Sequence, residues 1–532
     1  MAAATLENKD NFGASENGDD RQSKALVDNN KGGIKTMPFI IANEICEKLA
    51  MVGFSKNMGM IVLTLSAALP HLRPPPCEGN QVCQEANGTQ TGILYLALML
   101  AALGSGGIRP CVAAYGAEQF VEDDPRHPKK TWVFFNWYYF ALGAAILIAS
   151  TVLVYIQDHV GWSLGLGIPT IAMALSIIVF LMGYPLYRNL DPAGSPYTRV
   201  LQVCVAAFRK RKIPLVSNPK FLYVNEELDA SISTDGLLHH TKQFKFLDKA
   251  AIVTEEDGVK TSEKPNLWRL NTVHRVEELK CIVRMLPIWA AGILFATSNA
   301  QQNTFSLEQA NTMNKHLTKS FEIPSASMSV FSMMSMLIMI VVYDRLLVHV
   351  ARRFTGLDRG INFLQRMAIG FFIAILATLA AGFVEVKRKH AASTAGLIDS
   401  PKSTIPISVF WLVPQYSLLG IAEAFMVIGH LEFFYNQAPE SMRSTATALF
   451  WTSISAGDYT STLLVTLVHK YTDWLPNQNL NKGKLEYFYW LLTVLQALNF
   501  VYYLICTKFY TFKALQSQKI EHDEGVELSA QV

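Results

Sequence analysis

The sequence predicts an all-α polytopic membrane protein, and three observations support this fold class. Half of the 532 residues are hydrophobic and only 17% are charged, against roughly 25% in an average soluble domain. The charges collect in the first 35 residues, in 188–280 and at the C-terminal end. Long apolar runs lie between them without the alternation typical of barrel strands, so these runs are predicted to be spanning helices.

A spanning helix needs about 20 mostly apolar residues, and ten runs qualify. They are 37–72, 91–116, 133–156, 163–187, 278–299, 326–350, 362–385, 404–428, 443–468 and 486–508. Four of these runs precede the polar segment 188–277 and six follow it. The first run, as one straight helix, would be longer than an ordinary tilted span, and Gly59 offers a break point.

Segment 188–277 contains the basic run 209–212 and is predicted to be a cytosolic linker, because basic residues concentrate on the cytoplasmic side. Counting spans outward from this linker places both chain ends in the cytosol and loop 73–90 outside. The run 387–389, Lys-Arg-Lys, then falls outside and breaks the charge rule.

The outer loop 73–90 carries two signals of an oxidising compartment. Cys77 and Cys83 are close enough in sequence to pair, and Asn87 begins an Asn-Gly-Thr glycosylation acceptor. Free thiols and a chance acceptor sequence are the alternative. Residues 1–36 are polar, without a secretory signal, and are predicted to form a disordered cytosolic tail. Residues 511–532 are predicted to be a second cytosolic tail.

Ionisable side chains inside the spans are the most informative feature, since each costs about 2.5–3.5 kcal/mol to insert. Glu44, Glu47 and Lys48 share one face of the first helix. A carboxylate cluster in a low dielectric beside a cation can take up and release a proton. We predict proton coupling here, with a structural ion-pair network as the alternative.

Two further charges lie in opposite halves of the chain. Arg109 belongs to a glycine-rich stretch of the second run, and Glu423 is a lone carboxylate in the eighth. We predict that they pair as a gate, with a permanent bridge as the alternative. The polar run 299–305, which begins with Asn299, either lines a cavity or marks the outer end of its helix.

Several function classes have no support in the sequence. It contains no phosphate-binding loop, no metal-ligand spacing and no nucleophile elbow, so ATP-driven transport, a metal site and an enzyme are not predicted. The net charge of +3 gives no argument for nucleic acid. The expected partners are the lipid bilayer, a small solute and protons, with the proton gradient in place of a cofactor.

Several motifs resemble the proton-coupled oligopeptide transporter family, in its plant nitrate/peptide branch. The first-helix pattern Glu44-x-x-Glu47-Lys48 is one, and the strings at 102–125, 134–140 and 434–451 are others. The strings at 37–50 and 275–289 look most like the third subfamily. The likeness runs from about residue 33 to residue 510.

The resemblance implies a major-facilitator fold, with two six-helix bundles and a midplane site between them. It implies that Glu44, Glu47 and Lys48 couple protons, and that Glu423 pairs with Arg109, which replaces the family's usual Lys. Asn299 stands where a nitrate-transporting member has its His. The implied activity is symport of nitrite, nitrate or a carboxylated hormone such as gibberellin, with di- or tripeptides as the alternative.

The chain departs from the family pattern after Met58, where about two helices have no counterpart. The N-terminal bundle, 37–187, is therefore expected to have about four spans, and the C-terminal bundle, 278–510, six. We predict that this shortened chain transports poorly or not at all. It would then act as a regulator that associates with its full-length parent or forms a homo-oligomer, in the plasma membrane or the plastid envelope.

Overall fold

The computed structural model describes most of the chain from Asn57 onward. The described residues are 57–72, 74, 86–119, 131–187, 194–216, 221–233, 236–254, 257, 265–318, 321–357, 360–400, 403–476 and 479–513. The predictions for Glu44, Glu47, Lys48, Cys77 and Cys83 fall outside these residues. Arg109 lies on a described helix, but its side chain is outside the description.

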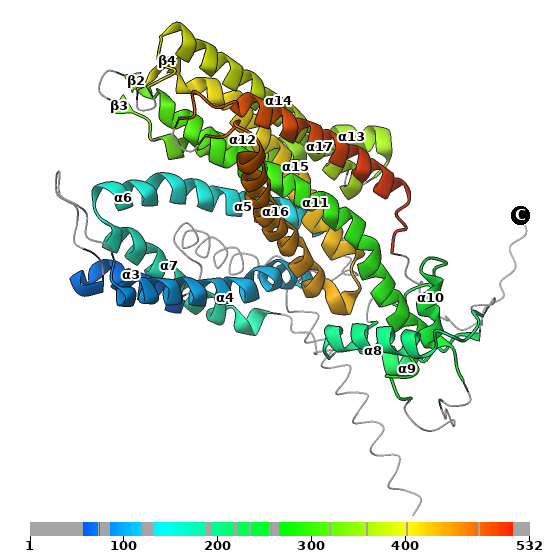
Figure 1. Cartoon of the computed structure of the whole chain (residues 1–532). Coiled ribbons are helices and arrows are strands. Elements are labelled where there is room, and N and C mark those ends of the chain that lie inside the picture. The colour runs from blue at the N-terminus through cyan, green and yellow to red at the C-terminus, as the bar shows by residue number, and fades with distance from the viewer. Residues whose placement is uncertain are drawn as a thin grey trace, which may run out of the picture. The chain divides into compact units, whose positions relative to one another are not determined.

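The chain divides into two compact units. Unit 1 comprises Met1–Leu190, Pro287–Tyr435 and Thr447–Lys508, and unit 2 comprises Asp191–Leu286, Asn436–Ala446 and Phe509–Val532. Almost all regular structure is helical (Figure 1). The predicted all-α fold class is therefore confirmed, and four very short strands are the only departure among the described residues.

The first half of unit 1 contains five α-helices in the described part of the chain. They are α3 (Asn57–Ala68), α4 (Gly88–Glu118), α5 (Thr131–Ile148), α6 (Val154–His159) and α7 (Trp162–Met182). A π-helical turn, Ala149–Leu153, joins α5 to α6, and short 3-10 turns span Pro70–Leu72 and Tyr184–Leu186. Asn87 is the N-cap residue of α4, and its backbone N–H donates to the Gln90 side-chain oxygen. Asn87 is exposed, and its glycosylation stays a prediction.

Gly59 allows α3 to pack closely against α4. A Cβ on Gly59 would lie 2.7 Å from both the Ala97 carbonyl oxygen and the Ala101 nitrogen. The hydroxyls of Thr64 and Thr170, 3.0 Å apart, join α3 to α7. The α3 helix continues through Gly59, the candidate break point, and uses this residue for close approach.

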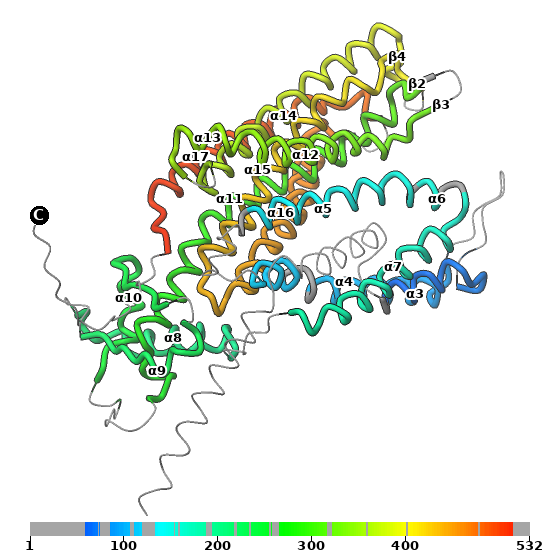
Figure 2. The backbone as a smooth tube through the Cα atoms, turned by 180° about the vertical axis from the view of Figure 1, so that it is seen from behind, coloured from blue at the N-terminus to red at the C-terminus, as the bar shows by residue number. Residues whose placement is uncertain are grey.

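The second half of the chain supplies six long helical segments in the described residues. They are α11 (Val273–Thr312), α12 with α13 (Val330–Val342 and Val348–Thr355), α14 (Phe363–Thr394), α15 (Val413–Gln437), α16 (Arg443–Tyr471) and α17 (Leu485–Lys508). A π-helical turn, Tyr343–Leu347, joins α12 to α13, and 3-10 turns cover Ser325–Ser329, Val409–Leu412 and Glu440–Met442. Figure 2 follows these helices from behind.

Eight helices of the described chain are long and apolar enough to cross a membrane. They match eight of the ten predicted spans. The α16 helix matches the predicted run 443–468 but is more polar, with Asp458 and His469 among its residues. The predicted run 37–72 is described only from Asn57, where α3 covers 12 residues.

Two predicted boundaries are wrong. The run ending at residue 299 belongs to α11, which continues to Thr312, because its buried glutamines find partners inside the bundle. Gln302 donates to the carbonyl of Gln415, and Gln301 to Ser461. The run starting at 404 begins with a strand, β4 (Ile405–Ser408), parallel to β1 (Met313–Asn314); β2 (His316–Thr318) and β3 (Phe321–Glu322) pair antiparallel.

A buried ion pair stabilises one end of the second half. Arg388 donates two hydrogen bonds to Glu385, each 2.7 Å, and both residues are fully buried. Arg388 also donates to Asn481 at 2.7 Å and to Thr312 at 2.9 Å, while Gln309 donates to Glu385 at 2.7 Å. The network therefore joins α11 and α14 to the loop before α17.

The same region explains the exception to the charge rule at 387–389. Arg388 is neutralised by Glu385, and Lys389 forms a 2.8 Å ion pair with Glu486. The Lys387 ammonium lies 3.1 Å from the centre of the Trp411 ring. Because these cations have partners, the run is a poor signal for the side of the membrane.

We expect Arg388→Met to reduce the free energy of unfolding by about 3–5 kcal/mol, since it leaves the Glu385 carboxylate buried and unpaired. Titration of micelle-solubilised protein with sodium dodecyl sulfate measures this. The matched control is Lys482→Met, which removes an exposed pair with Asp399 and should cost about 0–1 kcal/mol. Equal effects of the two variants would contradict the structural role of the network.

Unit 2 shows that the predicted linker is folded. It contains α8 (Pro196–Arg209), α9 (Glu226–Asp229), α10 (Lys245–Asp248) and the 3-10 turn Lys249–Ala251. These elements pack with the start of α11 around a small apolar core: Val203, Ala206, Ala207, Leu222, Leu247, Ala250, Ala251, Ile252, Val276 and Leu279. The polar composition of the segment concealed this core, because its apolar residues are dispersed rather than grouped in runs.

A charged cluster in unit 2 has the donor types of a metal site. The ligand atoms of His240, Asp248 and Glu277 lie within 4.8 Å of one another. However, the Lys280 ammonium lies 2.6 Å from Asp248 and 2.8 Å from Glu277. The lysine already supplies the positive charge that these carboxylates need, so the cluster is an ion-pair network.

Candidate functional site

Unit 1 contains a cavity of about 350 Å³. The α5, α11, α12, α15 and α16 helices all contribute to it. The lining residues are Tyr139, Leu142, Gly143, Ile146, Gly292, Phe295, Ala296, Asn299, Ala300, Asn303, Met333, Met336, Glu423, Met426, Val427, His430, Phe450, Trp451, Ser453, Ile454 and Asp458. The lining is largely aromatic, aliphatic and Met side chains, with few polar groups, as is usual for small-molecule sites.

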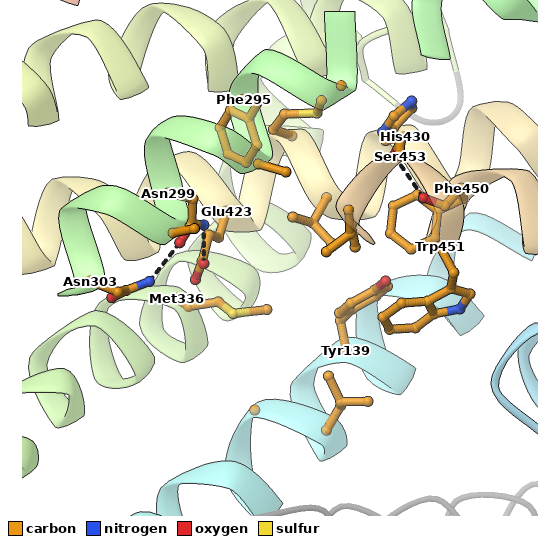
Figure 3. Close-up of a pocket in the computed structure, with 18 of the residues that line it drawn as sticks. Tyr139, Phe295, Asn299, Asn303, Met336, Glu423, His430, Phe450, Trp451 and Ser453 are labelled. Carbon is orange, nitrogen blue, oxygen red and sulfur yellow. Dashed lines mark hydrogen bonds between the residues drawn. The ribbon is translucent and has the colours of Figure 1, made fainter. Parts of the chain in front are cut away.

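One end of the cavity holds a polar relay of three side chains. The Asn299 amide donates to the Glu423 carboxylate at 2.5 Å, and the Asn303 amide donates to the Asn299 oxygen at 2.6 Å (Figure 3). Asn299 and Asn303 are one turn apart on α11, and Glu423 faces them from α15. Among the described residues, the partner of this carboxylate is thus a neutral donor, and the carboxylate lines the cavity.

The other end of the cavity holds His430, which is 2% exposed. Its ring packs on Phe434, 4.8 Å between centres, and on Phe450 at 5.5 Å. Its Nε2 has no hydrogen-bond partner among the described residues. A buried imidazole nitrogen without a partner can bind a polar group of a ligand, because satisfying it recovers part of its desolvation cost.

The two ends are separated by two helical turns. Glu423 and His430 are seven residues apart on α15, as are Asn299 and Gly292 on α11, which corresponds to about 10 Å along each axis. A Cβ on Gly292 would lie 2.3 Å from the His430 Cε1 atom. Glycine at this position therefore makes room for the imidazole.

Among the described residues of the first half, those of α5 line the cavity, and Figure 3 shows its Tyr139 near Trp451 of α16. The α5 helix packs against α12, and Asn136 donates to Asp344 at 3.5 Å. Phe135 packs edge-on against Tyr435 of α15 at 5.4 Å. The cavity thus has walls from both halves of unit 1.

The structure brings two predicted site residues together, Asn299 and Glu423. The predicted contact between Glu423 and Arg109 stays a prediction, because the Arg109 side chain is not among the described ones. The predicted proton-coupling role of Glu44, Glu47 and Lys48 also stays a prediction, because these residues are outside the described part of the chain. Of the two interpretations of run 299–305, the cavity is right. The helix end is wrong, since α11 continues for about two turns beyond residue 305, to Thr312.

Three polar residues of the cavity were not predicted: His430, Ser453 and Asp458. His430 is a polar residue in an apolar run, and this was the signal available for it. Among the aromatic residues at 136–140, Tyr138 and Tyr139 are both buried, and Tyr139 also lines the cavity. Periodicity alone does not separate these two roles.

Residues 51–481 match the POT family (PTR2). A curated relative, Protein NRT1/PTR FAMILY 3.1 of Arabidopsis thaliana, is 58% identical over 557 positions, which cover 93% of this chain and 94% of that protein. Protein NRT1/PTR FAMILY 8.5 of the same plant is 41% identical, with 91% of each chain covered. The chain belongs to the POT family, in its plant NRT1/PTR group, and is a multi-pass membrane transporter.

Solved structures are similar in fold. An auto-inhibited POT family peptide transporter matches with a TM-score of 0.55 at 17% identity, covering 90% of this chain and 98% of that one. The POT family transporter PepTSo matches with a TM-score of 0.51 and the same identity and coverage. The predicted family and its helical transporter fold are confirmed.

The first relative's alignment also bears on chain length. It extends over 557 positions, more than the 532 residues of this chain. The relative therefore has residues without a counterpart here.

Proposed function

We propose that the unit 1 cavity is the solute site of a proton-coupled symporter for a carboxylated solute with an apolar body, of which gibberellin is an example. The observation that carries this proposal is the composition of the cavity. Its long apolar wall is bounded by polar groups at Asn299 with Glu423 and at His430. The apolar body of such a solute would contact the apolar wall. Its two polar ends would reach the two polar groups, which are two helical turns apart.

Small nitrogenous anions, nitrite or nitrate, are the second candidate. Such an anion would leave most of a 350 Å³ apolar cavity unfilled. Asn299 offers a neutral amide rather than a switchable positive charge. Arg109 is the cation that the sequence offers for either a small anion or a carboxylate. A di- or tripeptide is less well supported, since its many backbone polar groups would face an apolar wall.

Proton coupling is proposed to involve Glu423 together with the Glu44, Glu47 and Lys48 cluster. Glu423 lies in the cavity, bonded to an amide that can donate to the ionised form and to a solute alike. When the carboxylate gains a proton, it becomes a donor as well as an acceptor. Solute and proton affinity are then linked, which is the thermodynamic requirement of symport.

The chain itself is proposed to be a weak transporter or inactive, because it lacks about two helices that family members have after the position of Met58. These helices belong to the first bundle. The surplus of positions in the relative's alignment supports this. We define the extended version as this chain with the relative's unmatched segment inserted between Met58 and Gly59. If the shortened chain does not transport, we propose that it acts as a regulator that associates with its full-length parent. The plasma membrane is the proposed location, with the plastid envelope as the alternative.

A substitution that fills the cavity tests the solute class. We expect Ala300→Trp in the extended version to reduce gibberellin uptake by about tenfold and nitrite uptake by less than about twofold, because pocket volume discriminates by size. Radiolabelled uptake in oocytes measures both. The matched control is Ile338→Trp, at a position of α12 that is 57% exposed, and it should change neither. Equal losses for both solutes after Ala300→Trp would reject the size argument.

A further inference from the structure

The α8 helix of unit 2 is buried on one face. Val203 and Ala206 are fully buried in the unit 2 core. On the same side the Arg199 guanidinium forms a 3.2 Å ion pair with Glu278. This face accounts for the packing of α8 within unit 2, so the remaining face needs a separate explanation.

The opposite face carries an exposed apolar stripe, which we call the α8 stripe: Tyr197, Leu201, Cys204 and Phe208. These residues are spaced by four, three and four positions and therefore share one side of the helix. Tyr197 is 69% exposed, Leu201 53% and Phe208 65%, and Cys204 is also exposed. A soluble surface helix usually carries polar residues at such positions.

Cations lie beside the stripe. The Arg211 guanidinium carbon is 4.3 Å from the centre of the Phe208 ring, and Arg209 and Lys212 are exposed next to it. Lys210 is different, since it is buried and bonded to Asp257 at 2.7 Å. Among the described residues, no carboxylate forms an ion pair with Arg209, Arg211 or Lys212, and α8 contains no acidic residue. The patch is therefore apolar and positive.

The chain connects this patch to the membrane at both ends of unit 2. Candidate span α7 ends at Met182 and α8 begins at Pro196. Val276 and Leu279, which belong to the unit 2 core, are in the first turns of candidate span α11. A bilayer surface is thus the partner within covalent reach.

We propose that the α8 stripe, with Arg209, Arg211 and Lys212, binds an anionic phospholipid surface. Amphipathic helices with aromatic and aliphatic residues on one face and flanking Lys or Arg lie in the membrane interface. Basic residues near a span are attracted to anionic lipid of the inner leaflet. The aromatic ring of Phe208 then lies at the boundary of the acyl chains, and the guanidinium of Arg211 lies in the headgroup layer.

Cys204 is a native reporter on the stripe. The full chain, with its six other cysteines replaced by alanine, is labelled at Cys204 with bimane and placed in nanodiscs. Spin-labelled phosphatidylcholine then quenches any label that enters the interface. We expect strong quenching when phosphatidylserine is present and weaker quenching in phosphatidylcholine alone. Arg211→Gln with Lys212→Gln should weaken the association by at least about fivefold, and salt should weaken it as well.

The matched control is a bimane at Ser231→Cys in the cysteine-free chain, since Ser231 is exposed in unit 2 but lies off the stripe. It should not be quenched. Cys204 quenching that matches this control, or that ignores phosphatidylserine and both cation substitutions, would overturn the proposal. So would a bimane emission shifted to shorter wavelength without lipid quenching, because that signature reports a protein neighbour on the stripe.

Discussion

Insertion of the relative's unmatched segment between Met58 and Gly59 is expected to raise the rate of gibberellin uptake by about tenfold or more, which corresponds to a decrease of at least about 1.4 kcal/mol in the activation free energy. The reason lies in the packing of α4. Only 12% of its most apolar stretch is buried, the lowest share of the eight candidate spans, against 72% for the span that contains α15.

Particular residues of α4 show the same low burial. Leu103 is 69% exposed, and a Cβ on Gly106 would meet no atom of the described residues within 4 Å. Glycines in spanning helices usually serve close helix approach, as Gly59 does. A glycine with open space beside it is therefore expected where a neighbouring helix is absent. Restoring that helix would cover this face and complete the first half of the solute path.

Uptake is compared between the two versions in oocytes, after surface biotinylation has equalised the amounts at the cell surface. The matched control is an insertion of the same length and hydropathy with a scrambled sequence, which adds apolar mass without the native contacts. Equal uptake per surface molecule by this chain and the extended version would show that the block is dispensable.

The second large effect is expected at Glu423. Glu423→Gln in the extended version should lower proton-driven uptake by about tenfold or more, within the range of a coupling free energy of 1–3 kcal/mol. Glutamine keeps the size of the side chain and can still accept the hydrogen bond from Asn299, but it cannot change its charge. Solute exchange at equal pH on both sides should therefore persist.

Glu308→Gln is the matched control for this variant, since Glu308 is an exposed residue of α11 outside the cavity. It should leave uptake and its pH dependence unchanged. Proton-driven accumulation that survives in Glu423→Gln would remove this carboxylate from the coupling mechanism. Loss of both accumulation and exchange would assign Glu423 to solute binding instead.

The sequence predicts the helices well because hydropathy measures what a bilayer requires. It fails where polar side chains satisfy one another inside the protein. The extension of α11 to Thr312 depends on buried glutamines, and the charges at 387–389 have partners in Glu385 and Glu486. A hydropathy scale treats each polar side chain as unfavourable in the membrane and takes no account of its partners. The length of α11 and the pairing of the charges at 387–389 are therefore seen only in the tertiary contacts.

The candidate site was predicted in part. Asn299 and Glu423 are recognisable as polar residues in apolar runs, and their contact joins positions 124 residues apart. His430 depends on Gly292 of another helix for its place, so its position is a property of helix packing. The folded core of unit 2 depends on dispersed apolar residues, which carry no periodic signal long enough to identify.

The most direct test of the proposed function is proton-dependent current and uptake in oocytes, at acidic and neutral external pH, for this chain and the extended version. Gibberellin, nitrite, nitrate and a dipeptide are offered separately. We expect the extended version to take up gibberellin with an inward current that grows at acidic pH, while this chain stays near background. Uptake by the extended version that is independent of pH, or that favours the dipeptide, would contradict proton-coupled transport of a carboxylated apolar solute.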